Sequence, residues 1–232
     1  MRPIIHVAIA GAVASVLCSS AVAATRITSG MASFSSDQQD PVQLSLESFD
    51  RALGSLQSVI VECFDSGRVA IKADNDDPYH AGRAQVRMIR SWMASGPDVT
   101  AFADETILSR HSVTLAKDNG DGRVFDASRP DGHNFGILSY SHHLVGPFHP
   151  LPLSLYETVG PGSVIFTVTP LLMINDLSFV GPAPQSYQLE LQEPVLRVKV
   201  KVKYVYHLPE PSSLFLLIGG LPVLLRRRQA LR

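Results

Sequence analysis

The residues best suited to chemistry in this 232-residue chain are aspartates gathered in one glycine-rich stretch. The segment Asp118-Asn-Gly-Asp-Gly122 is followed by Asp126 and by Asp131-Gly132. Clustered carboxylates suggest calcium, which takes about six to eight oxygen ligands. The spacing does not match an EF-hand, because the third position counted from Asp118 is Gly120, where that loop requires an acid. The sequence therefore favours a solvated turn and predicts no metal site here.

Three histidines, His142, His143 and His149, raise the question of a second metal site. Adjacent residues of a strand face opposite sides, so His142 and His143 would not share one ion. The intervening Gly146-Pro147 is typical of a turn, and no Cys or Glu stands ready as a further ligand. We therefore predict no metal ion and no cofactor for the chain.

Cys63 lies in an apolar run and is predicted to be a small buried side chain rather than a nucleophile. Removal of a leader that contains Cys18 would leave it without a partner for a disulfide. The chain has no nucleophile-elbow motif, no phosphate-binding loop and no zinc signature. No catalytic residue is predicted, and the chain is not expected to be an enzyme.

Residues 1–23 have the features of a secretory signal peptide. Arg2 gives a positive start, an apolar core follows, and Ala21-Val22-Ala23 is a small-residue cleavage site. The mature chain is therefore predicted to begin near Ala24. The alternatives are an uncleaved anchor and lipoprotein processing at Cys18, which the bulky preceding leucine disfavours.

Residues 209–232 contain three parts in a fixed order. They are the tripeptide Pro209-Glu210-Pro211, an apolar run from Leu214 to Leu225, and a basic cluster of Arg226, Arg227 and Arg228. Arginines beside an apolar segment stay on the cytoplasmic side, so the C-terminus is predicted to lie inside. The tail resembles the PEP-CTERM sorting signal, which exosortases, membrane transpeptidase-like enzymes, recognise and cut.

The apolar part of this tail is short for a permanent membrane anchor. Thirteen residues, Ser213 to Leu225, carry no charge, whereas about 20 are needed to cross the bilayer core. The resemblance implies transient membrane contact and cleavage by an exosortase-like enzyme; the alternative is a weak anchor that is never cut. We expect a membrane-attached precursor that moves to the cell surface, outer envelope or extracellular matrix of a Gram-negative bacterium.

Processing at both ends would change the charge of the chain. The full sequence has 20 Lys and Arg against 21 Asp and Glu. Five of the cations lie in the removable ends: Arg2, Arg226, Arg227, Arg228 and Arg232. If the cut follows Glu210, 15 cations and 21 acids remain, a net charge of −6. An acidic mature protein argues against nucleic acid as a partner.

Residues 24–208 are long enough to form one domain with its own core. Short apolar stretches punctuated by Gly and Pro predict an all-β fold, as a two-layer antiparallel β-sandwich, flanked by the signal peptide and a C-terminal hydrophobic sorting helix. Val42 to Phe49 alternates between apolar and polar residues, and so does Leu196 to Tyr206. The second segment turns four cations to one face, Arg197, Lys199, Lys201 and Lys203. We expect these to keep a sheet face soluble; the alternative is binding of an anionic polysaccharide.

Three local patterns predict further structure. Asp65-Ser66-Gly67 is typical of a turn between a strand at Leu56 to Phe64 and a strand at Arg68 to Ala73. The stretch from Ala84 to Trp92 fits a short amphipathic helix as well as a strand. The Asn-Gly and Asp-Gly steps within residues 119–122 favour a β-hairpin.

Three blocks of this region resemble the choice-of-anchor E domain. Leu44 to Val61 resembles its first two strands and the Phe-Asp-x-x-Leu-Gly-x-Leu connection between them. Asp131 to Gly136 resembles its mid-domain Asp-Phe-Gly region, and Val198 to Tyr206 resembles its final strand. The resemblance implies an extracellular all-β domain and brings no catalytic residue.

These observations favour an exported, non-enzymatic protein with a structural or interaction role. An exopolysaccharide-binding module is the alternative, favoured if the basic stripe lies beside exposed aromatic rings. A hydrolase is less favoured and would require two acids, or a serine and a histidine, to converge in a cleft.

Overall fold

The computed structural model describes residues 23–209, apart from residues 39 and 123. This part of the chain is all-β and its two large sheets are antiparallel, as the sequence predicted. It contains no helix long and apolar enough to cross a membrane. The predicted leader up to residue 22 and the predicted sorting helix lie outside the described residues.

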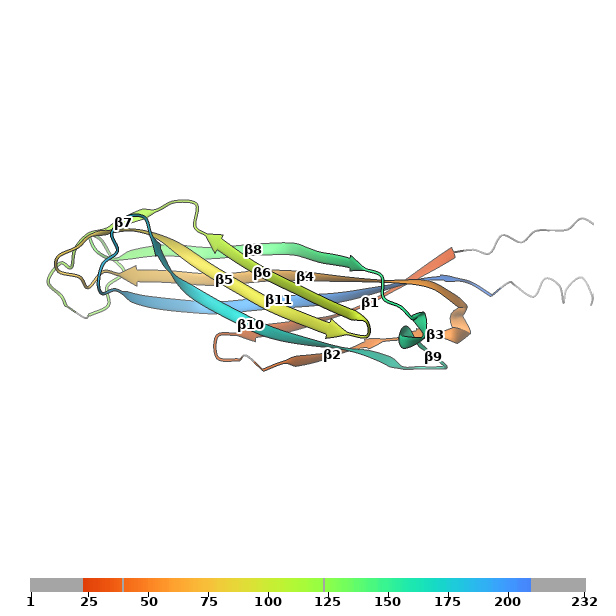
Figure 1. Ribbon diagram of the computed structural model, residues 1–232. Helices are drawn as coiled ribbons and strands as arrows, with labels where there is room; N and C mark the ends of the chain where they lie inside the picture. Colours follow the sequence, from red (N-terminus) through yellow and green to blue (C-terminus); the bar gives the residue numbers. More distant parts are fainter. Residues whose placement is uncertain (1–22, 39, 123, 210–232) are drawn as a thin grey trace, which may run out of the picture.

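Two sheets form the body of the domain (Figure 1). The first has the order β1 (Ala23–Ser35), β11 (Gln188–His207), β4 (Ser55–Asp74) and β8 (His133–Phe148). The second has the order β2 (Val42–Glu47), β10 (Ser163–Phe179), β5 (Gly82–Gly96) and β6 (Val99–Leu108), with β7 (Val113–Leu115) paired to β5. A short parallel pair, β3 (Phe49–Asp50) and β9 (Glu157–Thr158), lies beside the 3-10 turns Arg51–Leu53 and Leu153–Tyr156.

The core lies between the two sheets. Val198, Val200 and Val202 of β11 are buried, whereas the basic residues between them lie on the outer face. They belong to one cluster with Phe166 of β10 and Trp92 of β5 from the opposite sheet. The predicted alternation of this last strand is confirmed, because a period of two places every second side chain in the core. The arrangement is consistent with the predicted β-sandwich.

The predicted turn at Asp65-Ser66-Gly67 is wrong, since β4 runs through these residues without a break. Asp65 is buried and accepts hydrogen bonds from Trp92 and Tyr140. A Cβ atom at Gly67 would collide with the ring of Tyr140, so this glycine makes room for a neighbour rather than a turn. Only a bulge between β4 and β8 marks the place.

Strand pairing decides the structure of the other two segments for which the sequence predicted local structure. Ala84 to Trp92 lies in β5, paired on both sides, so it is a strand and not a helix. The predicted hairpin at residues 119–122 is wrong, because β7 pairs with β5 whereas β8 pairs with β4. The segment is therefore a long loop that passes from one sheet to the other.

A polar layer divides the core into two apolar clusters. On β5, Trp92 belongs to one cluster and Met88 to the other, and Arg90 lies between them, fully buried. The Arg90 guanidinium donates to the carbonyl of Ile174 at 3.1 Å and to Oδ1 of Asn175 at 2.7 Å. Burial lowers the pKa of Arg90 to about 10, so the side chain stays charged at neutral pH.

The two ends of the domain differ in what they contain (Figure 1). The terminal end holds the start of β1, the end of β11 and the two 3-10 turns. The acidic end, as we call it, consists of Asp74 and the loops at residues 75–81, 116–132 and 180–187. Because β11 has 20 residues, about 65 Å separates the two ends.

Candidate functional site

Asp77 ties the loops of the acidic end together. Its side chain is 2% exposed and accepts hydrogen bonds from the backbone amides of Tyr79 and Gln185, at 2.8 and 2.7 Å. Nδ1 of His80 lies 2.9 Å from Oδ2 of Asp77. These contacts, above all the one from Gln185, hold the pKa of Asp77 well below its usual range. The Asp77 carbonyl also accepts the amide of Asp118 at 3.0 Å, so the next loop is fixed to the same centre.

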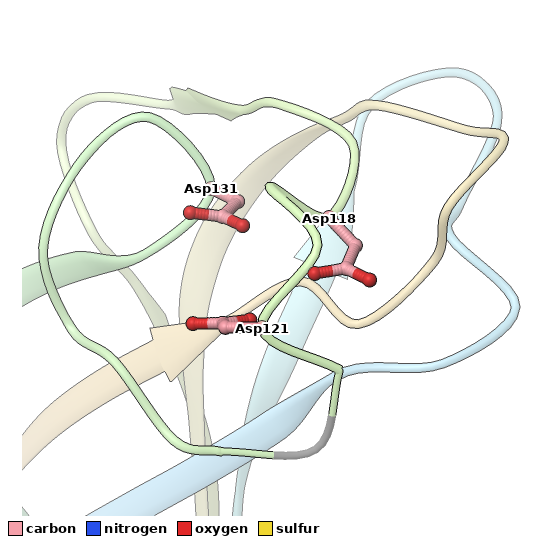
Figure 2. Close-up of side chains that lie close together, drawn as sticks. All are labelled: Asp118, Asp121 and Asp131. Carbon is pink, nitrogen blue, oxygen red and sulfur yellow. The ribbon is translucent and has the colours of Figure 1, made fainter.

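Asp118, Asp121 and Asp131 converge in the loop between β7 and β8. One carboxylate oxygen of each can be chosen so that all three lie within 4.8 Å of one another. Figure 2 shows the three side chains around a common space. Asp131 is fully buried and accepts from the amide and the side chain of Asn119, at 2.7 and 3.2 Å, whereas Asp121 is exposed.

Asp74, at the end of β4, is a fourth carboxylate beside this group. It is 1% exposed, and its Oδ2 accepts the amide of Asp126 at 2.8 Å. Its Oδ1 is buried and has no hydrogen-bond partner among the described residues. Burial raises the pKa of Asp74, and the charges of Asp131 and Asp121 raise it further. Asp74 belongs to an acidic stretch that the sequence shows, but it could not be joined to this group from the sequence, because it lies 44 positions before Asp118 and only the fold brings the two loops together.

A basic depression lies on the outer face of the first sheet. Its volume is about 390 Å³, and its wall combines three cationic side chains with one acidic, two apolar and two hydroxyl side chains: Arg197, Lys199, Lys201, Asp65, Met31, Phe64, Ser66 and Ser141. Met31, at the edge of this depression, is 60% exposed. The basic stripe predicted from the sequence therefore lies beside one aromatic ring, that of Phe64.

The cations of this depression are not equivalent. Lys201 contacts Oε2 of Glu62 at 2.8 Å and lies 5.8 Å from the ring centre of Phe64. Arg197 and Lys199 form no ion pair within the part of the chain that the structure describes. Their charges are therefore the ones open to an anionic ligand.

Among the described side chains, His143 lies between two carboxylates. His143 lies with Nδ1 3.4 Å from Oδ1 of Asp65 and with Nε2 3.2 Å from Oε1 of Glu105. Both ring nitrogens thus face carboxylates, and neither is directed at a serine hydroxyl. Gly146-Pro147 is not the predicted turn but part of β8, where a φ of 114° at Gly146 accompanies a bulge. His149 follows the end of that strand.

Cys63 occupies an inward position of β4 in the larger apolar cluster and is fully buried. Burial raises the pKa of its thiol to about 12, so the thiolate is scarce at neutral pH. This burial matches the expectation from the sequence.

The predicted processing residues lie at or beyond the ends of the described chain. Ala23 and Ala24 are the first two residues of β1, and Pro209 follows the end of β11 by two positions. The remaining members of both signals lie outside the described residues: Ala21, Glu210, Pro211, Arg226, Arg227 and Arg228.

Comparison with known proteins adds no family. No protein-family model and no curated protein matches the chain. Two solved structures, those of the infectious bursal disease virus Gt and Gx strains, align with 11% identity and TM-scores of 0.21 and 0.19. The alignments cover 83% and 80% of this chain and 38% and 37% of the viral chains, so this chain spans well under half their length. Similarity this low carries no argument about fold or function.

Proposed function

We propose that this chain is an exported protein of the cell surface or extracellular matrix, processed at both ends, with a structural or binding role rather than a catalytic one. The proposal rests on the resemblance of residues 209–232 to the PEP-CTERM sorting signal and on the signal-peptide pattern of residues 1–23.

One structural observation supports it most directly. The described part of β1, from Ala23 onward, pairs with β11 along all 13 of its residues, and its first pair joins Ala23 to His207. The two expected cleavage points thus lie beside each other at the same end of one strand pair. Cleavage after Ala23 and near Pro209 would leave nearly every pairing of the two sheets intact. In the precursor, the acidic end would lie about 65 Å from the point where the tail leaves the domain.

The arrangement of His143 also favours a non-catalytic role. A hydrolytic serine needs a free imidazole nitrogen to take its proton, and both nitrogens of this ring face Asp65 and Glu105. The buried Cys63 thiol is similarly unsuited to act as a nucleophile.

The test is the intact mass of the mature protein. The full chain is expressed in a host that carries an exosortase-like enzyme, and the released protein is analysed. We expect it to start near Ala24 and to end before Arg226. As a control, alanine at all three positions of Pro209-Glu210-Pro211 should allow export but leave the protein in the membrane with its arginines. A released wild-type protein that keeps Arg226, or normal processing of the triple variant, would refute the proposal.

A second candidate function is binding of an anionic polysaccharide in the basic depression. The observation that favours it is the pair of unengaged cations, Arg197 and Lys199, beside the Phe64 ring. Alginate, a polyuronate, should bind the exported protein more tightly than neutral dextran. Lys199→Glu should weaken binding, whereas Lys203→Glu, the same change outside the depression on the same strand, should have a smaller effect. Equal effects of both changes would indicate only general charge attraction and would contradict a defined site.

A further inference from the structure

Three carboxylates of the acidic end form one compact group. Asp118, Asp121 and Asp131 have carboxylate oxygens within 4.8 Å of one another. No lysine, arginine or histidine among the described residues forms an ion pair with any of the three. Three carboxylates this close repel one another, so the arrangement is favourable only when a cation or protons balance it.

Asp74 is a second, independent observation at this end of the domain. It comes from β4 of the sheet rather than from the loop, and its side chain is almost completely buried. One oxygen is used by the amide of Asp126, but Oδ1 has no partner among the described residues. A buried carboxylate oxygen without a donor is rare in folded proteins, and an ion or an ordered water molecule would satisfy it.

Asp74 lies against the loop that carries the other three carboxylates. Its Oδ2 accepts the amide of Asp126, which stands between Asp121 and Asp131 in that loop, at 2.8 Å. Figure 2 shows Asp118, Asp121 and Asp131 around a common space in the same loop.

The geometry suits a calcium ion. Oxygens on opposite sides of Ca²⁺ lie about 4.6 to 5.2 Å apart, twice the usual Ca–O distance, so a set that spans 4.8 Å can surround it. All four groups are carboxylates, the hard ligands that calcium prefers over nitrogen or sulfur. Calcium also tolerates the irregular ligand sets of loops, whereas Mg²⁺ demands a near-octahedral one.

We propose that the acidic end binds one Ca²⁺ ion. Asp118, Asp121 and Asp131 are its direct protein ligands, and Oδ1 of Asp74 is reached through a water molecule. Backbone carbonyls and water complete the shell. The two loop contacts that Asn119 makes to Asp131 hold the buried ligand in place before the ion arrives. The site does not depend on processing of the tail, so it stands apart from the proposed function.

The test uses the exported protein, stripped of metal with a chelator and titrated with CaCl₂ to about 10 mM, a range that covers the affinities of extracellular calcium modules. Calorimetry should show one site, and the thermal midpoint should rise with calcium concentration. MgCl₂ at the same ionic strength should give a much smaller rise. An equal response to both salts, or none to calcium, would overturn the proposal.

Two variants separate binding from folding. Asp121 is exposed, so Asp121→Asn should fold normally and lower the calcium affinity at least tenfold. Asp74→Asn keeps an oxygen for the Asp126 amide and removes a buried charge. It should raise the midpoint of the metal-free protein and reduce the further rise that calcium gives. Asp104→Asn, an exposed aspartate on β6, is the control and should behave as wild type. Calcium affinity of Asp121→Asn equal to that of Asp104→Asn would overturn the proposal.

Discussion

The two ends of the sandwich are closed by different chemistry. At the terminal end, Phe49 is fully buried, with ring centres 5.9 Å from Tyr204 and 4.9 Å from Tyr206. At the acidic end, the interior positions next to the loops are taken by Asp74 and Asp131. Apolar packing needs no further component, whereas buried carboxylates need donors or a cation. The terminal end is therefore complete in the protein alone, whereas the acidic end carries the calcium site that we propose.

The largest expected effect lies at the terminal end. Phe49→Ala should lower the free energy of unfolding by about 3 to 5 kcal/mol, because it removes a fully buried aromatic ring. Urea unfolding should give the same loss with and without calcium. Phe102→Ala, at a position 56% exposed on β6, is the matched control and should cost far less. A loss at Phe49 that depends on calcium would contradict the view that the terminal end is complete without a ligand.

A smaller effect on stability is expected at Asp77, whose side chain holds the loops of the acidic end together. The pKa of Asp77 in the folded protein is lowered mainly by the hydrogen bond from the Gln185 amide. The Asp77 carboxylate therefore stabilises the fold fully above the ordinary aspartate pKa of about 3.9. This stabilisation is lost as the pH falls toward the lower pKa of the folded state. Asp77→Asn should therefore lower the urea midpoint at pH 7. The difference from wild type should shrink below about pH 4. A difference that stays constant down to pH 3 would contradict this assignment.

The smallest effect concerns Cys63, which lies in the same apolar cluster as Phe49 and Tyr204. With a thiol pKa of about 12, it should resist a thiol reagent in the native protein, with or without calcium. Cys63→Ala should cost about 1 kcal/mol. Rapid labelling of the native protein would show that the packed end opens more readily than its burial implies.

The last strand could be predicted because its period is simple. Val198, Val200 and Val202 alternate with lysines, and a slip of one residue would bury the charges. All-β class and the burial of Cys63 followed from similar local patterns. Such patterns require only that neighbouring residues face opposite sides of a sheet.

The predicted turn at Asp65-Ser66-Gly67 is wrong because contacts with residues far away in the sequence decide the structure of this segment. Asp65 is buried to accept from Trp92 and Tyr140, and Gly67 leaves room for the Tyr140 ring. The residue types of a local turn motif give no information about hydrogen-bond donors that lie 27 or 75 positions away in the sequence.

The candidate calcium site could not be predicted from the sequence for the same reason. Asp118, Asp121 and Asp131 were visible as an acidic stretch, but their spacing does not match an EF-hand loop. Asp74 belongs to another element, and its unpartnered oxygen is a property of the folded chain. The four carboxylates thus come together only because the loop crosses from one sheet to the other.

Hydrogen exchange of the backbone amides, measured on the exported protein with and without calcium, tests the contrast between the two ends most directly. We predict that calcium slows exchange in residues 116–132 and at the end of β4, while the amides of β1 near Ala24 and of β11 near Tyr206 keep their rates. Slowing of both ends alike, or of neither, would contradict the account.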